Sequence, residues 1–297
     1  MARDLLTLVR NALGDRYRVD REIGRGGAAR VFSAQDPEGR AVALKILHPE
    51  LQVSTTADRF LREIRLAAQL DHPNIARLLD SGEKDWLVYY VMPYVEGPTL
   101  RQVLDRTRQL TLPDALRVAD DLLSALDHAH ARGVVHRDVK PENILISREG
   151  AVLVDFGIAR AIDASAADRL TRSGIAVGTS QYMSPEQINA MQAPDHRGDI
   201  YSVGCVLFES LAGRPPFNNR SEAVVLQLHL TEPPPNLHEL RPAVPASVAA
   251  VIARALAKQP EERWPTAAAM REALTSHTAE PASAMAAEAG RPTPERL

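Results

Sequence analysis

The sequence predicts an α+β protein with two lobes, a small β-rich lobe followed by a larger, mainly helical one. Residues 17–47 alternate between apolar and polar types as strands do, whereas apolar stripes at helical spacing dominate after Gly97-Pro98. The 297 residues are enough to bury a sizeable core. We therefore expect a small lobe over 17–93, a hinge over 93–97 and a large lobe over 98–276.

A leader helix, three strands and two turns are expected in the first part of the chain. Residues 1–16 form a leader, whose apolar positions over 3–13 have helical spacing until Gly14-Asp15 interrupts them. The strands are expected at 17–23, 30–34 and 40–47. A Gly-rich turn at 24–27 separates the first two, and Asp36-Pro-Glu-Gly39 is a ready turn between the second and third.

The remaining elements follow from the same patterns. A helix is expected over 56–70 and is ended by Asp71-His-Pro-Asn74, and two further strands are expected at 75–80 and 86–92. Apolar stripes predict the helices of the large lobe at 113–131, 199–212, 221–230 and 246–258. The stretch between Gly157 and Ser184 lacks periodicity, which is unusual inside a compact domain unless the segment is functional. Residues 277–297 read as a disordered tail or linker.

Composition and charge exclude several classes of protein. Lys plus Arg is 35 and Asp plus Glu is 38, so a net charge of -3 argues against a nucleic-acid partner. The single cysteine, Cys205, excludes an internal disulfide and a Cys-based zinc site, and we expect it to be inert within a buried helix. No apolar run approaches the length that spans a membrane. We expect a cytoplasmic chain without a membrane span.

The segment from Ile23 to Val31 is rich in small residues and lies between two expected strands. Small residues let backbone N–H groups approach phosphates, although Gly-rich hairpin turns are common and this signal alone is weak. Ala29 stands at the third glycine position of G-x-G-x-x-G, and no helix follows. The segment therefore fits neither a dinucleotide fingerprint nor a Walker loop.

Lys45 lies in an apolar strand, where an ammonium without an anionic partner would lose its charge. Glu63 lies on or beside the inward face of the helix expected at 56–70 and is the candidate partner. Taken singly, Lys45 could extend its ammonium to solvent from an edge strand, and Glu63 could be a surface residue. Only Lys45, Lys84, Lys140 and Lys258 are lysine in this arginine-rich chain, so each lysine stands out.

The most specific motif is His136-Arg-Asp-Val-Lys-Pro-Glu-Asn143, followed by Asp155-Phe-Gly157. It resembles the catalytic loop of protein kinases, and Asp155-Phe-Gly157 matches their magnesium-binding motif. The order of the Gly-rich loop, strand lysine, helix glutamate, catalytic loop and Ser184-Pro-Glu186 is also the family order, over about 17–276. The sequence resembles the bacterial, eukaryotic-like serine/threonine protein kinases, and this resemblance implies a two-lobed protein kinase fold.

The resemblance also implies the chemistry and its residues. The chain would transfer the γ-phosphate of ATP to Ser or Thr hydroxyls of proteins. Lys45, held by Glu63, would contact the α and β phosphates. Asp138 would orient the acceptor hydroxyl, and Lys140 would lie near the transferred phosphoryl group. Asn143 and Asp155 would hold Mg²⁺, with Mn²⁺ as an alternative.

By the same resemblance, ATP occupies a slot between the lobes. The residues implied along its phosphates are Gly24, Arg25, Gly26 and Gly27. Those implied around adenine are Ile23, Val31, Ala43 and Leu145, with Met92 behind it as the gatekeeper. The hinge contacts would come from the Pro93 carbonyl and the Val95 N–H. Pro93 departs from the acidic residue often found there, but only its carbonyl is needed.

Supporting and regulatory residues are implied as well. Asp199 is either a helix N-cap or the anchor of the catalytic-loop backbone, and the two readings are compatible. Arg263 resembles the arginine that pairs with Glu186, and Thr179 with Lys140 resembles the serine/threonine type. His128, His130 and His136 could suggest a metal site, but we favour helix packing for the first two.

Phosphorylation of Thr171 or Ser173 is expected to switch the chain on. A phosphate on either residue would bridge to Arg137, beside Asp138, and order the loop. A plain solvated loop is the simpler reading of such a polar stretch. The expected partners are protein substrates and a second copy of the chain for trans-autophosphorylation.

Two alternatives belong to other functional classes. A non-catalytic pseudokinase scaffold is encouraged only by Ala29 and opposed by the presence of Lys45, Asp138 and Asp155. A small-molecule phosphotransferase would share the catalytic Asp and Asn. The long segment 158–183 and Ser184-Pro-Glu186, which would form a peptide-docking platform, argue against it.

Overall fold

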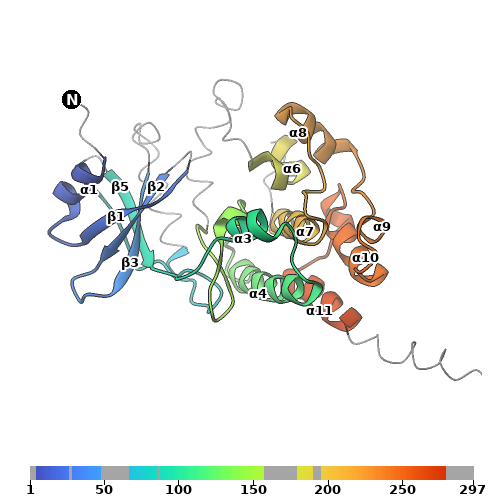
Figure 1. The fold of residues 1–297 in the computed structure, drawn as a ribbon, viewed down its shortest axis with the longest axis horizontal. Coiled ribbons are helices and arrows are strands. Elements are labelled where there is room, and N and C mark those ends of the chain that lie inside the picture. Colours follow the sequence, from blue (N-terminus) through green and yellow to red (C-terminus); the bar gives the residue numbers. More distant parts are fainter. Residues whose placement is uncertain are drawn as a thin grey trace, which may run out of the picture.

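The computed structural model of the chain describes residues 5–26, 29–47, 67–85, 87–156, 179–189 and 195–278. A β-sheet forms one end of the molecule and a set of helices the other, joined by the segment that leads from β5 into α3 (Figure 1). The expected α+β class and the order of the two lobes are confirmed.

The small lobe is built on a five-stranded antiparallel sheet in the order β1-β2-β3-β5-β4. Its strands are β1 Arg18–Arg25, β2 Ala29–Gln35, β3 Ala41–Leu47, β4 Asp80–Lys84 and β5 Leu87–Pro93. The strand expected at 75–80 is wrong, because Ile75 makes only an isolated bridge to Leu153 and the strand begins at Asp80. The β4 sequence, Asp-Ser-Gly-Glu-Lys, is polar throughout and carries no apolar alternation.

The two faces of this sheet have different neighbours. Alternation along β3 places Val42, Leu44 and Ile46 in a cluster on one face, which also contains Val9 and Leu13 of α1 Leu5–Leu13. The expected leader helix is thus packed into the core of the small lobe. The other face carries Ala43 and Leu47 and contacts Val154 and Leu145 of the large lobe. Most of the helix expected at 56–70, with Glu63, lies outside the described residues.

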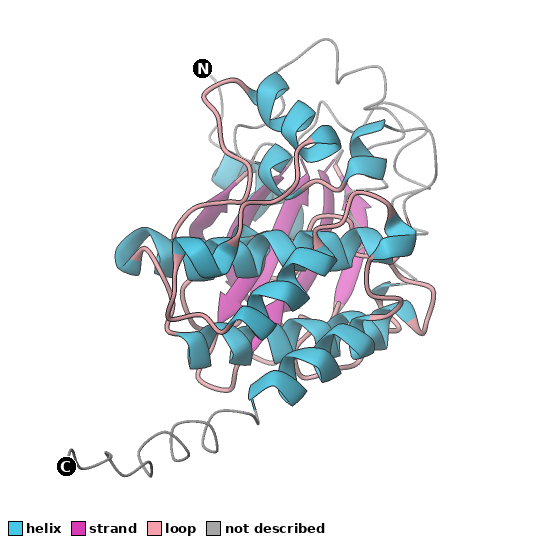
Figure 2. Cartoon of the chain, turned by 90° about the vertical axis from the view of Figure 1, so that its right-hand side faces the viewer, coloured by secondary structure: helices cyan, strands magenta, loops and turns pink. Residues whose placement is uncertain are grey.

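The large lobe is organised around a helix that is buried along nearly its whole length. This helix, α7 Arg197–Ala212, is buried from Gly198 to Leu211. The other α-helices are α3 Leu100–Thr107, α4 Leu112–His130, α6 Pro185–Asn189, α8 Glu222–Thr231, α9 Leu237–Leu240, α10 Ala246–Ala255 and α11 Ala267–Thr278. Viewed from this end, the helices lie in front of the sheet (Figure 2). The four helices expected from apolar stripes are confirmed, with ends within a few residues.

Short elements in the large lobe carry the motif residues. The 3-10 turn η2 Pro141–Asn143 leads into the hairpin of β6 Ile144–Ile146 and β7 Ala151–Leu153. Another 3-10 turn, η3 Thr179–Tyr182, precedes α6, and η4 Pro260–Glu262 precedes α11. Within the described ranges, no helix is both long and apolar enough to cross a membrane.

The connection between the lobes depends on a glycine. Gly97 has a φ of +143°, and a Cβ atom there would lie 2.1 Å from the carbonyl oxygen of Ile146. Any larger residue would push the linker away from β6. Immediately afterwards, Thr99 and Gln102 form a capping box that starts α3, so the chain enters the large lobe at a fixed position.

Candidate active site

Lys45 and Asp155 meet at the base of the cleft between the lobes. The ammonium of Lys45 lies 2.5 Å from Oδ2 of Asp155, and both side chains are largely buried, with 16% and 14% of their surfaces exposed. Residues 48–66 lie outside the described part of the chain, so the expected pair between Lys45 and Glu63 is not among the described contacts. The ion pair that the structure does describe for Lys45 joins it to the aspartate of the Asp-Phe-Gly motif.

Tyr90 is a site residue that the sequence reasoning missed. It stands opposite Lys45 in the register of β3 and β5, and its buried hydroxyl donates to Oδ1 of Asp155. Burial alone would raise the pKa of Asp155, but the charge of Lys45 and the hydrogen bonds from Lys45 and Tyr90 outweigh it and lower that pKa. Asp155 therefore stays ionised, as a ligand for a cation must.

Asp138 is surrounded by donors from its own loop. Its Oδ2 atom lies 2.8 Å from Nζ of Lys140 and accepts a hydrogen bond of 2.9 Å from Nδ2 of Asn143. The same amide nitrogen donates to the Asp138 carbonyl at 2.8 Å. The η2 turn thus brings three of the expected site residues together and fixes the direction of the Asp138 carboxylate.

The catalytic loop and the Asp-Phe-Gly segment are joined through His136. Its Nε2 lies 2.8 Å from the carbonyl oxygen of Val154, and its ring packs edge-on against Phe156 at 4.6 Å between centroids. Arg137 and Asp155 both have positive φ, at +68° and +69°, which is costly for residues other than glycine. The catalytic loop and the Asp-Phe-Gly segment are therefore both held in defined, strained conformations.

Asp199, in the first turn of α7, anchors the backbone of the catalytic loop. It accepts hydrogen bonds from the backbone N–H of His136 at 2.8 Å and of Arg137 at 2.7 Å, and lies 2.8 Å from Nε2 of His130. The N-cap interpretation is wrong, because α7 has His196 at its N-cap and Asp199 lies within the first turn. Its pKa is lowered although burial would raise it, because His130 and the donated hydrogen bonds stabilise the carboxylate.

The cleft face of the sheet brings most of the implied adenine-contact residues together. Val31, Ala43, Met92 and Leu145 belong to one apolar cluster, in which Ala43 and Met92 are cross-strand neighbours. Ile23, Gly24 and Arg25 end β1 beside it, and the N–H of Gly26 bonds the Ala29 carbonyl at 2.9 Å. Gly27, Thr171 and Ser173 lie outside the described residues, and Thr179 is described only as the start of η3.

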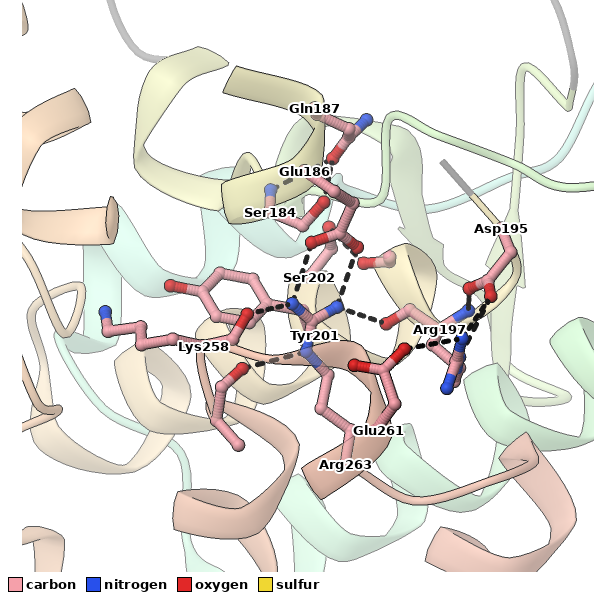
Figure 3. Close-up of polar contacts among 12 residues, drawn as sticks. Ser184, Glu186, Gln187, Asp195, Arg197, Tyr201, Ser202, Lys258, Glu261 and Arg263 are labelled. Carbon is pink, nitrogen blue, oxygen red and sulfur yellow. Dashed lines mark hydrogen bonds and ion pairs between the residues drawn. The ribbon is translucent and has the colours of Figure 1, made fainter. Parts of the chain in front are cut away.

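The Ser-Pro-Glu segment is fixed by a buried ion pair (Figure 3). Both oxygens of Glu186 accept from Arg263 at 2.7 Å, and the side chain of Arg263 is fully buried. Arg263 also donates to three backbone carbonyl oxygens, so all five N–H donors of its guanidinium are used. Gln187 links this platform to the catalytic loop, because it accepts from Ser184 at 3.0 Å and donates to the Arg137 carbonyl at 2.8 Å.

The residues present suit a nucleotide with a divalent cation. The apolar cluster between the lobes offers side chains against which a planar base can pack, and Lys45 offers a cation for phosphates. Asp155 offers carboxylate oxygens and Asn143 an amide oxygen, the hard donors that Mg²⁺ and Mn²⁺ accept. The side-chain nitrogen of Asn143 donates to Asp138, so the side-chain oxygen takes no part in that contact and is the atom suited to a cation.

Comparison with known proteins agrees with this geometry. Residues 17–275 match the protein kinase domain family. The chain is 43% identical over 283 residues to the serine/threonine-protein kinase PknB of Mycobacterium tuberculosis, covering 92% of this chain and 44% of that protein. It is 41% identical over 266 residues to PknH of Mycobacterium bovis, covering 89% and 44%. The chain thus spans less than half the length of these curated relatives.

The fold has a counterpart among solved structures. The crystal structure of the Mycobacterium tuberculosis PknI kinase domain, in a form with one cysteine replaced by alanine, is similar with a TM-score of 0.71 and 30% identity. The match covers 88% of this chain and 95% of that one. With the matched domain and the arrangement of Lys45, Asp138 and Asp155, these findings establish that the chain belongs to the protein kinase family, with serine/threonine kinases as its relatives.

Proposed function

We propose that this chain is an active serine/threonine protein kinase that transfers the γ-phosphate of ATP to hydroxyls of protein substrates. The observation that carries the proposal is the pair of oriented carboxylates at one cleft. Asp155 is held by Lys45 at 2.5 Å, and Asp138 is held by Lys140 at 2.8 Å and by Asn143 at 2.9 Å. Phosphoryl transfer needs positioned charge more than covalent chemistry, and both carboxylates supply it here.

Asp138 accepts or orients the proton of the acceptor hydroxyl. Its carboxylate is aimed by Asn143 and by the backbone that Asp199 anchors, so the hydroxyl is held in line with the phosphoryl group. Lys140, already beside Asp138, is close enough to neutralise charge that develops on the transferred group. Loss of Asp138 removes the nucleophile's partner but none of the nucleotide contacts.

On the nucleotide side, Lys45 exchanges Asp155 for the α and β phosphates, with Glu63 as its proposed second partner. Asp155 and Asn143 hold the divalent cation, for which we propose Mg²⁺ rather than Mn²⁺. When bound, this ion neutralises the phosphate oxygens and holds them in a reactive geometry. The backbone at Pro93 and Val95 is proposed to bind the adenine edge, and the Gly24–Gly27 turn to cover the phosphates.

Regulation by autophosphorylation completes the proposal. A second copy of the chain would phosphorylate Thr171 or Ser173, and the phosphate would pair with Arg137. The Arg137 backbone is already tied to Asp199 and Gln187, so a charge placed there acts on the catalytic loop directly. We also propose a catalytic domain over 17–276, preceded by the helix of 1–16 and followed by a tail over 277–297, in a cytoplasmic location.

Phosphosite mapping by mass spectrometry tests the activity. The wild-type chain is incubated with Mg-ATP and with an Asp138→Asn copy carrying a mass tag. Phosphoserine and phosphothreonine on the tagged copy are expected, since that copy cannot modify itself. An Asp138→Asn chain that autophosphorylates as fast as the wild type, or products that are mainly phosphotyrosine, would refute the proposal.

The switch is tested by initial rates. Dephosphorylated wild type should accelerate after preincubation with Mg-ATP, whereas a Thr171→Ala, Ser173→Ala double mutant should not, with Thr171→Ala carrying the larger share. A double mutant as fast as the preincubated wild type would show that these residues are not the switch.

A further inference from the structure

Arg101, in the first turn of α3, lies between three other parts of the large lobe. Its guanidinium contacts both carboxylate oxygens of Glu209 at 2.9 Å and Oε1 of Glu142 at 3.1 Å. It also donates to the Tyr182 hydroxyl at 2.6 Å, and Tyr182 itself donates to Glu209. One arginine thus satisfies two carboxylates that come from α7 and from the η2 turn.

The charges in this cluster are not equally buried. The Glu209 side chain is 6% exposed, Arg101 is 25% exposed and Glu142 is 46% exposed. The cluster is therefore buried at Glu209 and open to solvent at Glu142. A buried carboxylate such as Glu209 needs a cation, and in this chain Arg101 supplies it.

The open side adjoins the place where a substrate must lie. Glu142 belongs to the same short loop as Asp138, which orients the acceptor hydroxyl, and as Lys140, which contacts Asp138. Tyr182 ends η3 and is separated from the Ser-Pro-Glu segment by Met183 alone. A peptide whose hydroxyl reaches Asp138 therefore passes close to Glu142 and Tyr182.

We propose that Arg101 determines substrate specificity by filling, with the chain's own guanidinium, an acidic site that would otherwise bind an arginine of the substrate peptide. This inference rests on the proposed function. Two carboxylates and a phenol oxygen form a set of acceptors that suits the forked donors of a guanidinium. Because Arg101 occupies them, an arginine near the acceptor residue brings a substrate no advantage.

Removal of Arg101 exposes this site to the substrate. Glu209 is then left buried without its cation, and a guanidinium supplied by the peptide relieves that cost. The wild type and the variant should therefore differ in which peptides they prefer, in addition to any change in rate. A purely structural role for Arg101 would lower the rate for every peptide by the same factor.

The test is a positional scan with serine peptides. Arginine replaces alanine singly at each position within about four residues of the acceptor, and kcat/KM is measured for every peptide. For the wild type we expect ratios of arginine to alanine within about threefold of one at all positions. For Arg101→Ala we expect the ratio at one position to rise by about tenfold or more, as a recovered charged hydrogen-bond pair implies.

Further variants assign the gain to this cluster. Arg101→Ala combined with Glu209→Gln should lose the gain, because the buried charge is gone. Arg106→Ala is the matched control, since Arg106 is an exposed arginine of the same helix that bonds only the Gln102 carbonyl among the described contacts, and its profile should equal the wild-type profile. Arg101→Gln, which can still donate to Glu209, repeats the comparison if the alanine variant fails to fold.

The possible results separate this inference from the proposed function. A wild type that phosphorylates no peptide, neutral or basic, refutes the kinase activity itself. A wild type that already prefers arginine by tenfold refutes the filled site. Folded Arg101 variants that keep a flat profile, or that are inactive toward neutral and arginine peptides alike, also refute it, whereas a variant active only toward an arginine peptide supports it.

Discussion

Asp199 is a fully buried carboxylate and Asp155 a largely buried one, and both have lowered pKa values, yet their partners differ in kind. Asp199 is held by two backbone N–H groups and by His130. Asp155 is held by the side chains of Lys45 and Tyr90. Backbone donors cannot leave without unfolding the loop, whereas a lysine and a tyrosine hydroxyl can turn to another partner. The partners of the Asp199 carboxylate are therefore permanent, whereas those of the Asp155 carboxylate in the cleft can be exchanged.

The Glu186–Arg263 ion pair resembles Asp199 in being buried and held by permanent partners, and we call these residues the scaffold. The Arg263 guanidinium is fully buried and saturated by two carboxylate and three carbonyl oxygens (Figure 3). The cleft around Asp155 and this scaffold should therefore respond differently to substitution. Changes in the cleft should mainly remove turnover, whereas changes in the scaffold should mainly remove stability.

The largest effect is expected from Asp155→Asn. The amide keeps the shape of the carboxylate but loses the charge that faces Lys45 and the cation, so kcat should fall by on the order of 10²–10³-fold. The melting temperature should fall less than in a variant of Arg263. Steady-state kinetics and thermal unfolding measure both, and a variant with near-wild-type kcat would contradict the assignment of Asp155.

For the scaffold we expect the opposite result, a large loss of stability. Arg263→Met leaves Glu186 buried without a partner and should lower the free energy of unfolding by about 3–5 kcal/mol. Arg271→Met is the control, because Arg271 pairs with Asp120 at 2.5 Å but both side chains are more than 40% exposed, and its loss should cost less than about 1 kcal/mol. Urea unfolding compares the two. Equal losses would mean that burial does not distinguish these ion pairs.

A smaller effect concerns pH and a histidine of the scaffold. Burial, with the nearby charge of Lys258, lowers the pKa of His229 to about 3, and its Nδ1 lies 2.8 Å from the Tyr201 hydroxyl. Between about pH 6.5 and 3 the unfolded chain binds a proton that the native chain does not, so stability is present above pH 6.5 and is lost as pH falls.

The measurement isolates this histidine from other titrating groups. From pH 6.5 to 5 the wild type should lose about 2 kcal/mol more unfolding free energy than His229→Gln, whose amide can still accept from Tyr201. Parallel stability profiles of the two proteins would show that His229 is not kept neutral.

The sequence was sufficient for the contiguous motifs and for elements with clear periodicity. His136–Asn143 and the strands of the Gly-rich hairpin are local, so their residues and spacing carry the information. β4 was misplaced because its five residues are polar. Asp199 was assigned two roles because sequence shows that it starts a helix but does not show what faces its carboxylate.

Arg101 and Tyr90 show why parts of the site could not be read from the sequence. The partners of Arg101 lie 41, 81 and 108 residues away, so nothing near Arg101 marks it among the many arginines. Tyr90 lies in β5, where Leu87–Met92 are all buried, so periodicity cannot tell which face each residue takes. Both roles depend on tertiary pairing.

The smallest effect sharpens the comparison at Asp155 itself. If the bond from Tyr90 is exchangeable, it competes with the cation for Oδ1, and its removal should free the carboxylate. Tyr90→Phe should then lower the Mg²⁺ concentration for half-maximal velocity by about three- to tenfold, for a hydrogen bond with a net worth of about 1 kcal/mol. Initial rates at saturating ATP over a range of Mg²⁺ measure this. Tyr89→Phe is the matched control, because the neighbouring Tyr89 hydroxyl bonds Arg16 on the other face of the sheet. A raised Mg²⁺ requirement in Tyr90→Phe, with Tyr89→Phe unchanged, would instead make the Tyr90 bond a permanent support like those of Asp199.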